Sequence, residues 1–157
     1  MKRIIMTGAI LLGSLISFNS VAQPQMSEED MQKNAVASRQ AVFKLLGVAM
    51  GPLGGMARGG EYDEAAAKLS AERIMVLADM IPELFAMDTS SNSDLATKAQ
   101  NGIWGAQADF AGLAADLTAG ATAALETLNS KGADGVRQAV GQIGQKCGAC
   151  HDRFRMD

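Results

Sequence analysis

Apolar residues recur every three or four positions through most of this chain, which is the spacing of helices with one buried face. The pattern is clearest over residues 104–129, whose single stripe carries Phe110, Leu113, Ala114, Leu117, Ala121, Ala124, Leu125 and Leu128. Residues 27–51, 63–85 and 136–154 keep a similar spacing. No segment alternates apolar and polar residues with a period of two, so the sequence predicts helices and no strands.

The ends of these helices follow from local signals. Ser27 precedes three acidic residues, which is typical of an N-cap with favourable charges in the first turn, and Asp63 resembles a second cap. The segment "GPLGGMARGGEY", which begins at residue 51, contains Pro52 and five glycines, so we expect the first helix to end at residue 51 and a loop to follow. Pro82 marks the last turn of the second helix or a break in it.

Four amphipathic helices of similar length can bury their apolar stripes together, so the predicted fold is all-α, an antiparallel four-helix bundle. A different all-helical packing is the alternative. A polar connection, residues 88–101, joins the second and third helices. Acidic residues within the third helix argue against a membrane span there: Asp109, Asp116 and Glu126.

The first 22 residues are typical of an export signal. Lys2 and Arg3 precede an apolar run, and Ser20-Val21-Ala22 forms a small-x-small cleavage site. We expect cleavage after Ala22, which leaves residues 23–157 as one exported domain; an uncleaved anchor is the alternative. Loss of the leader leaves 12 of the 14 basic side chains against 17 acidic ones, a net charge of −5, and no basic stripe for nucleic acid.

The candidate chemistry lies near the C-terminus, in "CGACHDRFR". Cys147, Cys150 and His151 are the only cysteines and the only histidine of the chain. Positions three and four apart share a helix face, so we expect all three side chains to face the core together. Such a group could exchange disulfides, bind a metal or attach a haem, and Cys-x-x-Cys-His is the attachment signature of c-type haem.

The other two chemistries fit less well. Disulfide exchange needs thiols of lowered pKa, as at a helix N-terminus, whereas this pair lies near a helix C-terminus. A structural zinc site would need a fourth ligand from a carboxylate or water, because no further cysteine or histidine exists. The sequence therefore favours a haem attached through Cys147 and Cys150, with His151 as iron ligand.

Over its whole length after the leader, the chain resembles the cytochromes c prime. The similarity rests on "SRQAVFKLL", "YDEAAAKLSAERIMVLADMIPELF", "IWGAQADF" and "CGACHDRFR" at its C-terminal position. The resemblance implies a periplasmic, commonly homodimeric protein that is not an enzyme. It also implies one covalent haem c with a five-coordinate, high-spin iron that binds nitric oxide or carbon monoxide and can carry electrons to a partner protein.

The same resemblance implies roles for individual residues. Cys147 and Cys150 would hold the haem and His151 would be its proximal ligand. Arg39 and Gln40 would lie near a haem propionate, Phe43 over the distal iron face and Arg155 beside the proximal face. Phe43 as ordinary core and Arg39 as a surface charge are the alternatives. The connection between the second and third helices is longer than expected for the family, so its haem-edge contacts stay unassigned.

A low-spin electron carrier is the main rival function. With one histidine, a second histidine ligand from the same chain is impossible. A methionine could close the sixth position, and Met50 is the candidate because it lies seven residues after Phe43 on the same helix face. That spacing places Met50 about 10 Å further along the helix axis, which weakens this alternative.

Overall fold

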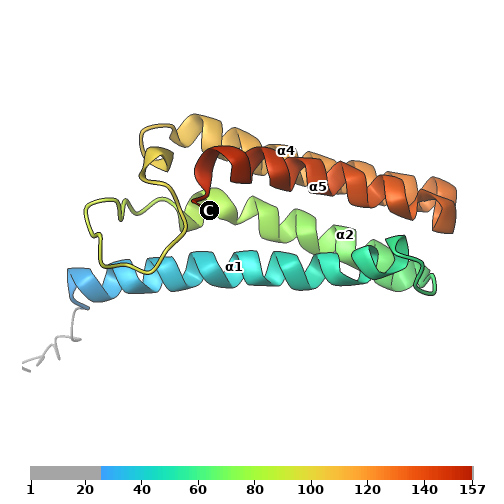
Figure 1. Ribbon diagram of the computed structural model, residues 1–157, viewed down its shortest axis with the longest axis horizontal. Coiled ribbons are helices and arrows are strands. Elements are labelled where there is room, and N and C mark those ends of the chain that lie inside the picture. Colours follow the sequence, from blue (N-terminus) through green and yellow to red (C-terminus); the bar gives the residue numbers. More distant parts are fainter. Residues whose placement is uncertain (1–25, 157) are drawn as a thin grey trace, which may run out of the picture.

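The computed structural model describes residues 26–156; the predicted leader, residues 1–22, lies outside this range. Four long helices run alternately up and down along one axis (Figure 1): α1 (Glu28–Ala57), α2 (Glu64–Asp79), α4 (Gln107–Lys131) and α5 (Val136–Phe154). Short helices connect them: α3 (Ile81–Leu84), η1 (Asn101–Ile103) and η2 (Gly132–Gly135). In the described part of the chain there is no strand, only an isolated bridge between two residues. The predicted antiparallel four-helix bundle is confirmed.

Helix α1 continues through Pro52, so the predicted end at residue 51 was wrong. A proline removes one helical N–H group, and its ring crowds the Cβ of the preceding residue. Here the preceding residue is Gly51, which has no Cβ to crowd. Leu53 is completely buried, so packing against the core holds the following turn in the helix.

The true end of α1 is a glycine cap further along. Gly59 has a left-handed φ of 99°, and the N–H of Gly60 donates to the carbonyl of Gly55 at 3.1 Å. The N–H of Gly59 also donates to the carbonyl of Met56 at 3.0 Å, which completes a Schellman motif. The glycines predicted to form a loop therefore serve partly as the last turn of α1 and partly as its cap.

The second predicted helix divides in two. Its N-cap is confirmed, because the side chain of Asp63 accepts a hydrogen bond from the N–H of Ala66 at 3.0 Å. The helix then breaks at Met80, and Pro82 lies in the first turn of the short α3, where a missing N–H costs little. The break turns the chain toward the long connection before α4.

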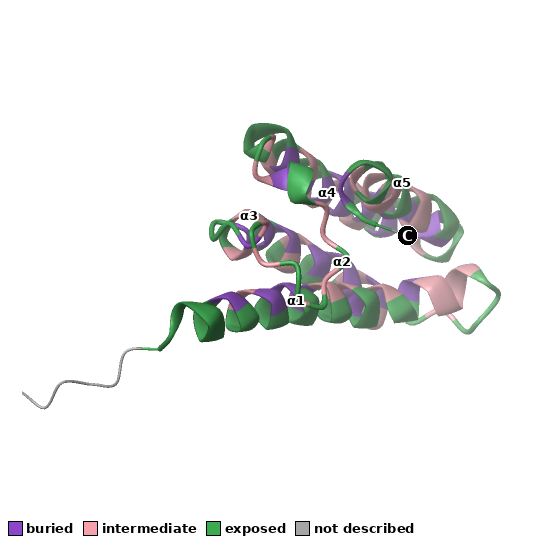
Figure 2. Cartoon of the chain, turned by 60° about the vertical axis from the view of Figure 1, so that its left-hand side comes forward, coloured by how far each residue is buried: buried purple, intermediate pink, exposed green. Residues whose placement is uncertain are grey.

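The helices are not packed equally closely. Helix α4 lies against α5 and α2 along most of its length, whereas α1 and α5 meet more sparsely. At the α4–α5 crossing, a Cβ on Gly120 would lie 2.9 Å from the carbonyl oxygen of Gln142, so only glycine allows this approach. Buried residues face the bundle interior and exposed ones the outside (Figure 2). Among residues 26–156, none of the helices is long and apolar enough to cross a membrane.

Candidate haem site

The sparse packing between α1 and α5 leaves a cavity of about 650 Å³. Side chains of α1 form one wall, and α4 and α5 form the other. Most of the lining is apolar, and it includes Leu46, Ile74, Leu113, Leu117 and Ile143. Cavities of roughly 300–1,000 Å³ with apolar walls and a few convergent polar groups are typical of cofactor sites.

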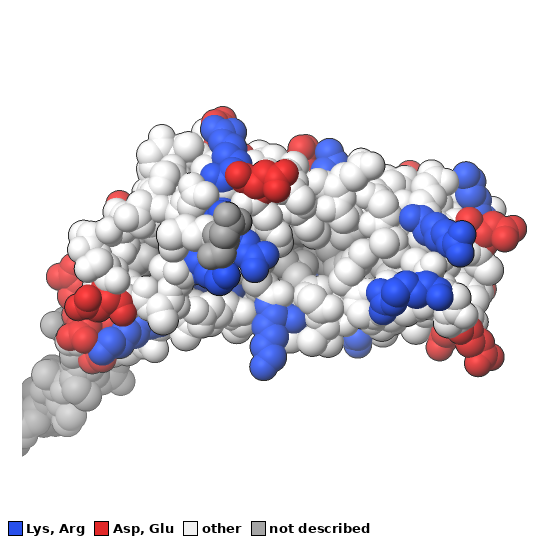
Figure 3. Space-filling view, in the orientation of Figure 1, with Lys and Arg blue, Asp and Glu red and all other residues white. Residues whose placement is uncertain are grey.

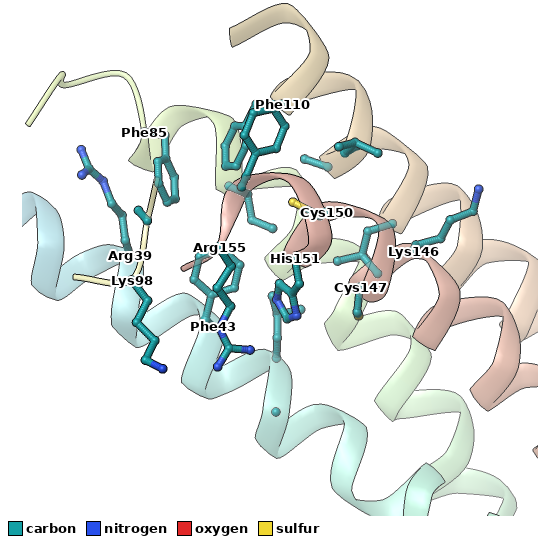
Figure 4. Close-up of a pocket in the computed structure, with 18 of the residues that line it drawn as sticks. Arg39, Phe43, Phe85, Lys98, Phe110, Lys146, Cys147, Cys150, His151 and Arg155 are labelled. Carbon is teal, nitrogen blue, oxygen red and sulfur yellow. The ribbon is translucent and has the colours of Figure 1, made fainter. Parts of the chain in front are cut away.

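The last turns of α5 carry the predicted motif into this cavity (Figure 4). Cys147 and Cys150 are half-buried, and neither forms a disulfide. His151 lines the same cavity and is more exposed than the two cysteines, so the three side chains of the motif face this cavity together. Helix α5 ends three residues after His151, at Phe154.

Burial shifts the pKa of all three groups. It raises the pKa of both thiols, and the neighbouring Cys147 raises that of Cys150 further. Burial also lowers the pKa of His151, and the positive charge of Arg155 lowers it again, against a smaller opposite effect of Asp152. Raised thiol pKa values are the reverse of what disulfide exchange requires, and a neutral imidazole is the form that binds metals.

The facing wall comes from one side of α1. Phe43, Leu46 and Met50 are all half-buried and line the cavity. The ring of Phe43 meets that of Phe85 edge to face, with centroids 6.2 Å apart. Met50, the candidate sixth ligand of the rival function, therefore lines the same cavity as Phe43.

Aromatic rings close the cavity at the end nearest the long connection. Phe85 lies at the centre of this group, 4.7 Å from Phe110 and 6.4 Å from Trp104 between ring centroids. Phe110 in turn contacts Phe154 at 5.4 Å. The indole N–H of Trp104 donates to the carbonyl of Phe85 at 3.1 Å, so the group is held by a hydrogen bond as well as by packing.

Arg39 is only 3 % exposed, and its guanidinium holds the long connection. Nε donates to the carbonyl of Leu84 at 2.9 Å, Nη1 to Oγ1 of Thr89 at 2.8 Å, and Nη2 to the carbonyl of Met87 at 2.6 Å. Burial lowers the pKa of this guanidinium, and the carboxylate of Asp88 partly opposes the effect. The alternative of Arg39 as a surface charge was therefore wrong.

Gln40 has a similar anchoring contact. Its side-chain amide donates to the carbonyl of Ala96 at 2.7 Å, and nearer the start of α1 the side-chain amide of Asn92 donates to Gln32 at 2.8 Å. Both Arg39 and Gln40 line the cavity, but their side-chain hydrogen bonds go to the connection. Their predicted position near a propionate stays a prediction.

The chain beyond α5 forms the remaining edge of the cavity. Arg155 pairs with Ala99 in an isolated antiparallel bridge. The N–H of Met156 donates to the carbonyl of Lys98 at 2.8 Å. The N–H of Gln100 donates to the carbonyl of Phe154 at 2.9 Å. Lys98 thus joins the cavity lining through a contact between distant segments, and no periodic pattern in the polar connection could have indicated it.

The donor set and the cavity fit a covalently bound haem. Two unpaired thiols at Cys-x-x-Cys spacing and the imidazole after them border a mostly apolar space, as attachment through two thioethers and one axial nitrogen requires. Within residues 26–156, no three histidine, cysteine, aspartate or glutamate side chains are grouped to hold a metal ion. The structure therefore adds no support to the zinc alternative.

Comparison with known proteins agrees with this site. The family model described as Cytochrome C' matches residues 34–155. The chain belongs to the cytochrome c' family. It is 34 % identical to a cytochrome c' of Cereibacter sphaeroides over 151 residues, which cover 94 % of this chain and 97 % of the relative. A crystal structure of a variant cytochrome c' from Rhodopseudomonas palustris superposes with a TM-score of 0.72 at 32 % identity, covering 79 % of this chain and 98 % of that one.

Cytochromes named differently match about as well. A cytochrome c-556 from Agrobacterium tumefaciens is 34 % identical over 120 residues, covering 76 % of this chain and 92 % of the relative. Cytochromes c' are c-type haem proteins with a four-helix bundle and are not enzymes, so these sequence predictions are confirmed at the level of the family. Because both names occur among the relatives, family membership alone does not choose between gas binding and electron transfer.

Proposed function

We propose that this chain is an exported c-type haem protein that binds nitric oxide or carbon monoxide at an open iron position. Cys147 and Cys150 would hold one haem covalently and His151 would bind its iron. The observation that carries the proposal is the cavity itself, where this motif faces an α1 wall formed by Phe43, Leu46 and Met50. When bound, the haem would supply an iron with one free coordination position.

The α1 wall supports a preference among diatomic gases. Phe43 has no hydrogen-bond donor and no lone pair, so it can neither bind the iron nor donate to a ligand there. Dioxygen binding to haem depends strongly on a distal hydrogen-bond donor, whereas nitric oxide and carbon monoxide depend on one much less. An apolar and crowded site therefore favours these two gases.

Two further parts of the proposal concern location and assembly. Export to the periplasm rests on the leader, residues 1–22. A homodimer rests on an apolar face of α1 and α2, where Leu45, Val48, Leu69 and Val76 are 51 %, 63 %, 43 % and 66 % exposed and border one groove. Contiguous exposed apolar side chains of this kind mark interaction surfaces, and a two-fold dimer would cover the face with its own copy.

Mass and absorption measurements on the purified protein test the central claim. We expect the mass of residues 23–157 plus one haem, retention of the haem in acid acetone, and high-spin bands in both oxidation states. The Cys147→Ala, Cys150→Ala double variant should release its haem to the solvent, while each single variant keeps one bond. Extraction of the haem from the unmodified protein would refute covalent attachment.

Electron transfer through a six-coordinate iron is the second candidate. Met50 favours it, because its side chain lines the same cavity as His151. If the proposed gas-binding site is correct, Met50→Leu leaves the absorption spectrum unchanged, since leucine conserves the volume of the side chain. Conversion of sharp low-spin bands to high-spin bands in this variant would establish the electron carrier instead.

A further inference from the structure

The haem-edge contacts of the long connection can be assigned from the structure, on the basis of the proposed function. A haem carries its two vinyl groups on one edge and its two propionates on the other. If Cys147 and Cys150 hold the vinyl edge against α5, the carboxylates must lie on the side of the cavity away from these thiols. Cations that line that side and stay available are then candidates for binding them.

Arg39 is poorly suited to this task. All three of its nitrogens already donate to oxygens of residues 84–89, and its guanidinium lies over the Phe85 ring at 4.6 Å. In Figure 4 the end of this side chain points away from His151 and the cysteines. A propionate bound there would have to compete with three hydrogen bonds of 2.6–2.9 Å.

Lys98 and Arg155 have the opposite environment. Both line the cavity, both are exposed, and neither forms an ion pair with any residue in the range 26–156. The bridge between Ala99 and Arg155 brings the two cations together from distant segments of the chain. Figure 4 shows both side chains running toward the same open side of the pocket, and Figure 3 shows basic side chains gathered beside the hollow of this face.

We propose that Lys98 and Arg155 bind the haem propionates, and that the long connection between α3 and η1 serves to deliver Lys98 to this position. Two cations beside two carboxylates form charge-assisted hydrogen bonds. Arg39 and Gln40 then act indirectly: Arg39 holds the connection against α1 through Met87 and Thr89, and Gln40 holds it through Ala96. Lys98 and Arg155 are positioning residues for the haem.

The test compares single variants of the haem-loaded protein. Lys98→Gln keeps the backbone bond from Met156 but removes the cation, and Lys98→Arg restores it. Removing a cation beside the propionates favours the oxidised iron. Lys98→Gln should therefore shift the reduction equilibrium about threefold toward the oxidised form. At 59 mV per tenfold change, this lowers the reduction potential by about 30 mV. Arg155→Gln should shift it in the same direction. The propionate bending band in the resonance Raman spectrum should move in both variants and return in Lys98→Arg.

Lys44→Gln is the matched control, because Lys44 is another exposed, cavity-lining lysine that lies outside the bridge. It should leave the propionate band in place and shift the equilibrium less than half as far. The inference is overturned if the band stays unchanged in Lys98→Gln and Arg155→Gln, or if Lys44→Gln reproduces their effect. Absence of covalent haem in the unmodified protein would refute the proposed function instead, so the two failures are distinguishable.

Discussion

At the scale of single residues, Arg39 is a buried cation whose guanidinium donates hydrogen bonds to three oxygens. Within residues 26–156 it forms no direct ion pair, and the carboxylate of Asp88 acts on it only from a distance. Its three acceptors belong to Leu84, Met87 and Thr89, and the rings of Phe85 and Trp104 lie beside its guanidinium. Removing a buried cation leaves its acceptors without donors, which costs more than the bonds themselves contribute.

We therefore predict that Arg39→Met lowers the free energy of unfolding by about 2–4 kcal/mol, because three oxygens lose their donor. Arg39→Lys should recover only part of this, since an ammonium cannot reach three acceptors arranged for a planar fork. Urea unfolding of the haem-loaded variants measures the effect. Lys33→Met removes an exposed cation of the same helix that pairs with Glu29, so it should lower the free energy of unfolding only slightly. A loss equal to that of Arg39→Met would show that the number of charges, and not the buried hydrogen bonds, decides the stability.

Phe43 carries the sharpest prediction for ligand binding. If its ring covers the iron, an incoming ligand must move the ring aside. Complete removal of such a side chain from a core costs about 3–5 kcal/mol, and displacing it costs only part of that free energy. Each 1.4 kcal/mol of barrier slows binding about tenfold, so Phe43→Ala should accelerate carbon monoxide association by roughly one to two orders of magnitude. Flash photolysis measures this rate. An acceleration below about twofold would mean that Phe43 is ordinary core.

At the scale of helices, the close contact of α4 and α5 positions the haem motif. A Cβ at Gly120 would lie 2.9 Å from a backbone oxygen of α5, which cannot move aside without shifting that helix. Gly120→Ala should therefore destabilise the protein by about 1–3 kcal/mol through overpacking. Gly112 lies on the same helix, and a Cβ at that position would meet nothing within 4 Å, so Gly112→Ala should stabilise by about 0.5–1 kcal/mol.

Thermal unfolding measures the stability of these two glycine variants. If contact between the helices outweighs helix propensity at Gly120, the melting temperature falls in Gly120→Ala and rises in Gly112→Ala. Equal stabilisation by both substitutions would show that α4 and α5 can separate to admit a methyl group. The haem spectrum provides a second measurement, because movement of α5 at Gln142 would also displace His151, which lies on the same helix.

At the scale of the whole molecule, the exposed face of α1 and α2 predicts self-association. Val48→Glu and Val76→Glu each place a charge among apolar side chains that a dimer would bury, so each should convert a dimer to monomers in sedimentation experiments. Met87→Glu is the control, because Met87 is also exposed and apolar but does not border this groove. A monomeric unmodified protein at micromolar concentration would contradict the dimer.

The sequence alone determined those features whose causes are local. Helix periodicity, the caps at Ser27 and Asp63, and the spacing of Cys147, Cys150 and His151 depend on residues a few positions apart, so they could be read directly. The motif also indicated the type of cofactor, because two thiols and an imidazole on one helix face restrict the groups that can bind there. The end of α1 could not be read in this way, because burial of Leu53 outweighs the local effect of Pro52.

Only the tertiary structure decided which groups surround the motif. Arg39 meets Leu84 across 45 positions, Gln40 meets Ala96 across 56, and Gln100 meets Arg155 across 55. No periodic pattern marks these contacts, because the partners are irregular backbone and their pairing depends on how four helices pack. The same packing left α1 and α5 far enough apart for a cavity and brought Lys98 to its edge. Local sequence therefore specified the attachment chemistry, whereas contacts between distant segments specified its surroundings.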